Sequence, residues 1–375
     1  MTKLVFTQAA PLGTSSRALL KTTVDTNASS ILLRSGRSAT RVSRSLRLST
    51  RAASAVSFPE FLPAAVEEIT EPVARDLAMR LERVPVTSAI GAVAGNTVKV
   101  GVCAAPPKAR AGLGGSLPEA SDKPQVLCLH GFDSSCLEFR RLFPLLEEAG
   151  FEPWAVDLLG WGFTEMPVEV DYSPAAKRQL LYDFWKQYVG EPVVLMGGSI
   201  GGALAMDFAS EHPDAVSKLV LVDPQAFASL PPPPDAPPPL PAPLGFAGAA
   251  VLKSLPLRFL ATYMVFNDKS EANWDAIRIG RLHCLQDQWG QALVKYMQCG
   301  GPILLQKAVM EKMASIPQET LVLWGEQDDI LEKSNLESVT SSIVNTEVVF
   351  IDSCGHQPHV EQPRAVVEAL KSWIG

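Results

Sequence analysis

Long apolar runs are missing from this sequence. The nearest candidate, residues 245–266, is interrupted by Lys253, Pro256 and Arg258. A transmembrane helix needs about 20 mostly apolar residues, so we expect no membrane-spanning segment. Hydrophobic residues still make up 47% of the 375 residues, which is enough to build a large core.

Paired cysteine motifs are also missing. The cysteines show no C-x-x-C spacing or other pattern typical of a metal site or a redox centre. They are typical of buried thiols in a reducing compartment, and we expect neither a metal ion nor a cofactor. The six are Cys103, Cys128, Cys136, Cys284, Cys299 and Cys354.

Acidic residues are scarce at the N-terminus. Residues 1–59 contain nine Lys or Arg but one acid, Asp25, and carry +8, so that the remainder carries −15 of a net −7. An acidic remainder argues against a nucleic-acid partner. Residues 1–56 are also rich in Ser and Arg, which is typical of an organelle transit peptide cleaved near 51–56. A disordered basic arm is the alternative, and composition alone does not separate plastid from mitochondrion.

From residue 125 onward, short apolar runs alternate with segments of helical periodicity. This alternation predicts a doubly wound, mostly parallel α/β sheet, with ligand sites at the carboxyl ends of its strands. A helical lead-in over 58–84 and an antiparallel hairpin over 88–103 precede it. The remaining expected strands are 125–129, 152–156, 193–196, 219–222, 320–324 and 346–351.

The alternation stops between residues 225 and 315. Nine of the thirteen residues 231–243 are proline, which excludes a helix or a strand ladder and favours a polyproline or irregular tether. Residues 246–266 and 271–299 then read as helices. We therefore expect a helical lid at 225–315, between two parts of one core at 57–224 and 316–375.

The run that ends at Ser199 carries the clearest chemical signal. Gly197, Ser199 and Gly201 fit G-x-S-x-G between an apolar strand and a helix, which is the nucleophile elbow. The two glycines face each other closely, and a Cβ at either position would collide. A glycine-rich turn of this kind could instead hold a phosphate.

A nucleophilic serine needs a general base and usually a carboxylate behind it. His356 follows the last expected strand within a glycine-containing loop, and we favour it over His359, which we assign to packing or capping. Asp328 follows the preceding strand and is our choice of acid, with Asp223 as its rival.

An oxyanion hole needs two backbone N–H groups aimed at one point. Ile200 follows the nucleophile and supplies one, and Phe132, at the end of its strand, supplies the other. His130 is placed to brace the loop that carries Phe132.

Taken together, five landmarks in this order resemble the α/β-hydrolase superfamily, in its hydrolase-1 type with a helical lid. The resemblance covers about residues 98–375 and implies a triad of Ser199, Asp328 and His356. A serine at the nucleophile position, and the absence of proline after His130-Gly131, exclude an epoxide hydrolase or haloalkane dehalogenase. The landmarks are His130-Gly131-Phe132, residues 157–162, 197–202 and 324–328, and Gly355-His356.

Residues 130–141 and 280–285 are similar to those of uncharacterised plastid hydrolases of plants and green algae, which favours the chloroplast over the mitochondrion. The resemblance implies a serine hydrolase that cleaves a hydrophobic carboxylic ester, of acyl or prenyl type, through an acyl-enzyme. A carbon–carbon bond hydrolase and a ligand-sensing receptor of the same fold are the alternatives. The expected partner is a small hydrophobic substrate, and residues 252–260 could lie at a membrane surface, although burial of this lid helix is favoured.

Overall fold

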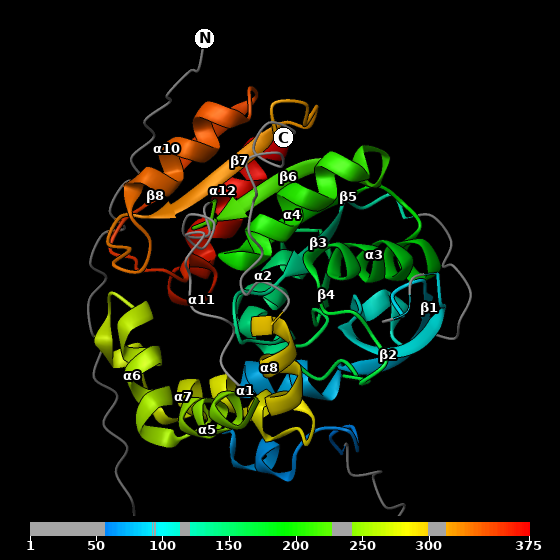
Figure 1. Ribbon diagram of the computed structural model, residues 1–375. Helices are drawn as coiled ribbons and strands as arrows, with labels where there is room; N and C mark the ends of the chain where they lie inside the picture. The colour runs from blue at the N-terminus through cyan, green and yellow to red at the C-terminus, as the bar shows by residue number, and fades with distance from the viewer. Residues whose placement is uncertain (1–56, 92, 94, 113–120, 227–241, 299–312) are drawn as a thin grey trace, which may run out of the picture. The chain divides into compact units, whose positions relative to one another are not determined.

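The computed structural model describes residues 57–375 except 92, 94, 113–120, 227–241 and 299–312 (Figure 1). The expected transit peptide and most of the proline-rich run lie outside the described residues.

Eight strands form one sheet in the order β1-β2-β4-β3-β5-β6-β7-β8. β1 and β2 form an antiparallel hairpin, β2 pairs antiparallel with β4, and the other neighbours run parallel. The predicted doubly wound, mostly parallel sheet is therefore confirmed. The strands are β1 (Glu82–Ser88), β2 (Val98–Ala105), β3 (Gln125–Leu129), β4 (Glu152–Val156), β5 (Val193–Gly198), β6 (Val216–Val222), β7 (Thr320–Gly325) and β8 (Thr346–Ile351).

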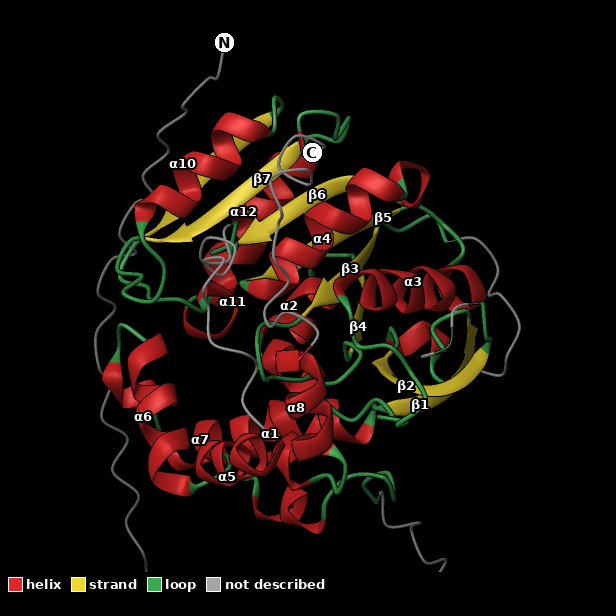
Figure 2. Ribbon diagram, in the orientation of Figure 1, coloured by secondary structure: helices red, strands yellow, loops and turns green. Residues whose placement is uncertain are grey.

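Helices cover both faces of the sheet, which explains why its central strands are apolar throughout (Figure 2). Along β5, Val193 and Leu195 pack into one apolar cluster, while Val194 and Met196 pack into the other. The first cluster includes α3 (Pro174–Phe184), α4 (Ile200–Glu211) and α10 (Lys333–Ser342). The second includes α1 (Pro72–Met79), α2 (Leu142–Glu148) and α12 (Pro363–Ile374).

The described residues between β6 and β7, within the segment for which the sequence predicts a lid, include four α-helices. We call them the insertion: α5 (Ala242–Leu252), α6 (Leu255–Val265), α7 (Trp274–Leu282) and α8 (Trp289–Gln298). Within the described residues, no single helix is long and apolar enough to cross a membrane. Leu244–Leu252 and Leu255–Val265 meet the length and composition test only as a pair, and they are bent by 65°.

The structure differs from the sequence-based expectation at two places. The helical lead-in ends before residue 84, because α1 ends at Met79 and residues 82–88 form β1, whose Val84 and Val86 point into the core. The hairpin expected over 88–103 is therefore formed by residues 82–88 and 98–105 instead. The helix expected over 271–299 is divided into α7, a short 3₁₀ turn η7 (His283–Leu285) and α8. In both places tertiary packing overrides the local pattern.

Candidate active site

The turn after β5 has the geometry that the elbow motif predicts. Ser199 lies between β5 and α4 with φ of 51°, a left-handed conformation that costs a non-glycine residue free energy. A Cβ on Gly197 would lie 2.3 Å from the carbonyl oxygen of Gly201, and one on Gly201 would lie 2.3 Å from that of Leu129. Only glycine fits at these two positions, and the turn places Ser199 at the carboxyl edge of the sheet.

His356 and Asp328 come together at the same edge, after β8 and β7. Nδ1 of His356 lies 2.8 Å from Oδ2 of Asp328. The other carboxylate oxygen of Asp328 accepts the N–H groups of Ile330 (2.7 Å) and Leu331 (3.1 Å). Burial acts to raise the pKa of Asp328, but its hydrogen bonds and the proximity of His356 lower it overall. The carboxylate is therefore charged at neutral pH and fixed in orientation.

The alternative acid, Asp223, lies near Asp328 and binds a backbone N–H group. One of its carboxyl oxygens accepts the N–H of Gly325 at 2.9 Å. Burial, followed by the charge on Asp328, raises the pKa of Asp223 well above its usual value. Asp223 thus lies beside Asp328, and it is Asp328 that contacts His356.

The loop after β3 brings Phe132 to the elbow. A Cβ on Gly131 would lie 3.5 Å from Cβ of Ser199, so this loop passes close to the elbow. Nε2 of His130 accepts the N–H of Leu158 (3.0 Å), which leaves the ring proton on Nδ1 to be donated to the carbonyl of Gly131 (2.8 Å). His130 thus braces the loop in the way that the sequence predicts.

These residues share one cavity of about 570 Å³. Ser199 and His356 line its floor, and Phe132 and Ile200 lie beside them. The insertion supplies much of the remaining wall, which is mainly apolar: Leu252, Leu257, Ala261, Val265 and Met297. An apolar cavity with a few convergent polar groups is the usual form of a small-molecule site.

Comparison with known proteins bears on this arrangement. The model of the alpha/beta hydrolase family matches residues 126–369. A protein of Arabidopsis thaliana, alpha/beta hydrolase domain-containing protein VTE7, is 36% identical over 317 residues, which cover 84% of this chain and 90% of that protein. The chain belongs to the α/β hydrolase family. It is accordingly a hydrolase.

More distant relatives of this hydrolase include lipases. Lipase 1 of Psychrobacter immobilis is 26% identical over 63% of this chain and 72% of its own. Among solved structures, a bacterial membrane phospholipase A matches with a TM-score of 0.59 and 22% identity over 80% of this chain and 88% of its own. A meta-cleavage product hydrolase of Pseudomonas fluorescens matches with a TM-score of 0.59 and 16% identity over 78% and 97%. At these identities the two structures show the shared fold alone.

A buried ionic cluster that the sequence did not reveal ties the insertion to the Phe132 loop. Asp133, with φ of 50°, accepts hydrogen bonds from Arg258 of α6, from His283 of η7 (2.8 Å) and from Trp289 of α8 (3.0 Å). Burial acts to raise the pKa of Asp133, but its two cationic neighbours lower it to about 2. The three partners follow Asp133 by 125 to 156 positions in the sequence, and no sequence motif links them to it.

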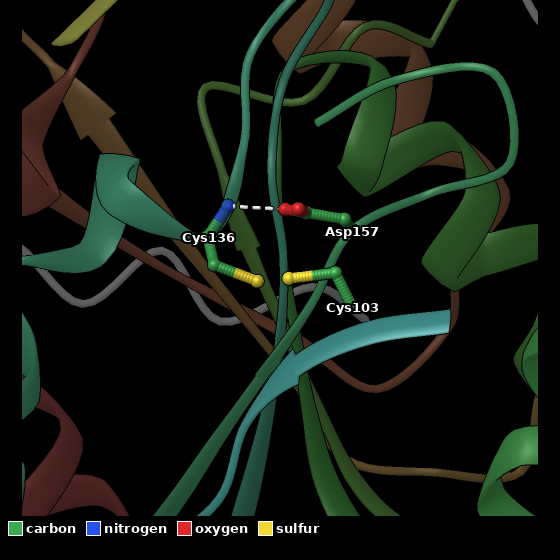
Figure 3. A group of neighbouring side chains, drawn as sticks. All are labelled: Cys103, Cys136 and Asp157. Atoms are coloured by element: carbon green, nitrogen blue, oxygen red, sulfur yellow. Dashed lines mark hydrogen bonds between the residues drawn. The ribbon is translucent and has the colours of Figure 1, made fainter. Parts of the chain in front are cut away.

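The fold also brings together Cys103, Cys136 and Asp157, which are far apart in the sequence. Figure 3 shows the thiols of Cys103 and Cys136 beside Asp157, with one possible ligand atom from each within 4.8 Å of the others. Both oxygens of Asp157 already accept N–H groups, from Cys136 (2.5 Å) and Phe163 (2.6 Å). Burial raises the pKa of Cys103 to about 12 and that of Cys136 well above its usual value. Protonated thiols are poor metal ligands, so this group fits a packing role.

Proposed function

We propose that this hydrolase cleaves carboxylic esters through a covalent intermediate on Ser199. The observation that carries the proposal is the hydrogen bond between Asp328 and His356, because His356 lines the same cavity as Ser199. A hydrogen-bonded His–Asp pair beside an elbow serine is the arrangement that activates a hydroxyl for attack. The relatives named as lipases support the choice of an ester bond.

In the proposed mechanism, Ser199 Oγ attacks the ester carbonyl while His356 takes its proton. The N–H groups of Phe132 and Ile200 stabilise the oxyanion, and His356 returns the proton to the departing alcohol. A water molecule, deprotonated by His356, then attacks the acyl-enzyme and releases the carboxylic acid. Asp328 holds His356 in the tautomer that both steps require.

A hydrophobic acyl or prenyl-type ester fits the cavity best. The walls supplied by α6 and its neighbours are apolar, and burying such a chain contributes about 0.8 kcal/mol per methylene group. We therefore expect kcat/KM to rise with acyl length until the cavity is full.

The outer face of the insertion supports contact with a membrane surface. Burial was favoured for this segment from the sequence, but eight large apolar side chains on α5 and α6 are exposed. Residues 242–267 contain no acidic residue in an otherwise acidic chain, and Lys253 is exposed there. An exposed apolar surface that carries a lysine and no acidic side chain suits the surface of a bilayer with anionic lipids. The eight are Leu244, Phe246, Val251, Leu255, Phe259, Leu260, Tyr263 and Met264.

We propose in addition that residues 1–56 direct the protein to the chloroplast. The support is their Arg- and Ser-rich, acid-poor composition and the similarity to a plant protein. Import of a fluorescent fusion of residues 1–56 into isolated chloroplasts or into mitochondria decides between the two organelles.

Labelling with a fluorophosphonate probe tests the proposed nucleophile. The probe should form an adduct on Ser199 that is lost in Ser199→Ala and kept in Ser210→Ala, a matched control in the same helix region whose hydroxyl bonds the carbonyl of Asp207. A p-nitrophenyl ester series then measures turnover. A folded protein that is neither labelled nor active would overturn the proposal in favour of a ligand-sensing role.

Flotation with vesicles of neutral and anionic lipid tests the membrane contact. Phe259→Glu and Leu260→Glu should abolish binding, because each introduces a charge into the apolar face. Val344→Glu, at a side chain exposed elsewhere to 71%, should leave it intact. Binding unaffected by the α6 variants would refute the contact, and concentration-dependent dimerisation that they abolish would assign the face to a second copy instead.

A further inference from the structure

A second buried pair, Glu138 and His359, lies beside the residues of the proposed mechanism. Glu138 belongs to the short turn η3 (Cys136–Phe139) and His359 to α11 (Pro358–Glu361). Both side chains are almost fully buried, at 3% and 2% exposure, and Nε2 of His359 lies 2.8 Å from Oε1 of Glu138. Neither residue takes part in the proton transfers described above.

Glu138 fixes one end of the loop that carries Phe132. Its carboxylate accepts the N–H of Gly131 at 3.2 and 3.3 Å, while the carbonyl of Gly131 accepts from His130. The two peptide groups that flank Gly131 are therefore both held. The second of them includes the N–H of Phe132, so its direction is set by Glu138 and His130 together.

His359 connects this carboxylate to the rest of the site. It lies three residues after His356, and its ring packs on Phe139 with centroids 5.3 Å apart. A Cβ on Gly198 would lie 3.3 Å from Cε1 of His359 and 3.4 Å from Oε1 of Glu138. The pair thus lies close to the residue before Ser199 and joins the His356 segment to the Phe132 loop.

Charge explains why two residues are needed. Burial acts to raise the pKa of Glu138, but its bonds to His359 and the charges around it lower it to about 2, so the carboxylate is ionised. An isolated buried negative charge would oppose the oxyanion that forms on the substrate nearby. The hydrogen bond with His359 at 2.8 Å stabilises the ionised carboxylate and keeps it in place as an acceptor.

We propose that Glu138 and His359 are positioning residues, which hold the N–H of Phe132 and the segment of His356 in register with Ser199. The inference rests on the proposed function, because it assigns Phe132 to the oxyanion. Loss of one oxyanion donor lowers turnover about 10²- to 10³-fold, and displacement of a catalytic group by 1 Å has an effect of about 10²-fold.

The test is a double-mutant cycle of Glu138→Gln and His359→Leu in the full chain. We expect each variant to lower kcat about 10- to 100-fold, with KM changed by less than about threefold. His359→Leu should be the more severe, since it leaves the ionised Glu138 without the hydrogen bond of its partner. The double variant should be no slower than His359→Leu, because both residues act through the same hydrogen bond. The inhibition constant of a trifluoromethyl ketone analogue should rise by the same factor as kcat/KM falls.

Glu147→Gln is the matched control, because it removes a half-buried glutamate bound to Arg80 at 2.8 Å on α2, away from the cavity. It should lower stability and leave kcat unchanged. Glu138→Gln with unchanged kcat, or with effects additive to those of His359→Leu, overturns the inference while the proposed function stands. Absence of turnover that depends on Ser199 in the wild type overturns both.

Discussion

Replacing Asp328 by asparagine tests the proposed mechanism most directly, because the structure determines how the amide must orient. Oδ1 of Asp328 accepts the N–H groups of Ile330 and Leu331, so the oxygen of an asparagine has to stay on that side. Its NH₂ group then faces Nδ1 of His356. A donor at this place forces Nδ1 to accept and moves the ring proton to Nε2.

A proton on Nε2 leaves His356 without a lone pair for the proton of Ser199. The wrong tautomer of a triad histidine lowers kcat by about 10⁴-fold, which corresponds to about 5.4 kcal/mol of transition-state stabilisation. KM should change little, since Asp328 does not line the cavity. The measurement is kcat on a p-nitrophenyl ester, with circular dichroism to show that the variant is folded.

Asp223→Asn is the control that makes this result decisive. Because burial and the charge on Asp328 raise the pKa of Asp223 well above its usual value, removing its ionisable proton should matter little. Asparagine also has the same shape and can accept the N–H of Gly325. We expect kcat within about threefold of the wild type. A loss of less than tenfold in Asp328→Asn, or a loss of 10³-fold in Asp223→Asn, would refute the assignment of the acid.

Three further outcomes are expected. Asp133→Asn should lower the free energy of unfolding by about 3 to 5 kcal/mol in urea titrations, because it leaves buried cationic partners unpaired. Since the pKa of Asp133 is lowered from 3.8 to about 2, its stabilising contribution is complete above pH 3.8 and lost as pH falls through about 2, so wild type and variant should converge in stability in acid. Gly197→Ala should abolish labelling of Ser199 and lower Tm, since its Cβ would lie 2.3 Å from a carbonyl oxygen. Cys103 and Cys136 should resist iodoacetamide in the native protein, because their buried thiols are protonated, and mass spectrometry checks this.

Local patterns predicted those parts of the site that local geometry determines. The elbow depends on glycines two residues from Ser199, and His130 bonds the carbonyl of the next residue, Gly131. Both features could therefore be predicted from the spacing of residues along the chain. The choice between Asp223 and Asp328 was harder, because β6 and β7 are neighbours and both carboxyl groups follow strands. Position in the sequence could not show which one contacts His356.

Contacts between distant segments could not be predicted. Glu138 lies in an ordinary Leu-Glu-Phe stretch, and its partner His359 is 221 positions away, so the pattern gave no reason to join them. In β1, the sequence Glu-Arg-Val-Pro-Val-Thr-Ser is short and contains a proline. Its pairing with β2, and not its own propensity, makes it a strand.

The cluster around Asp133 also affects how the substrate range of such an enzyme can diverge. Three separate pieces of the insertion converge on this one carboxylate, whereas Leu257, Ala261 and Val265 of α6 contribute apolar side chains to the cavity wall. Substitutions at these three positions can reshape the cavity for a different acyl group, while the anchor of the Phe132 loop is preserved. Within α6, the apolar residues that set the shape of the cavity are therefore different from Arg258, which anchors the Phe132 loop through Asp133.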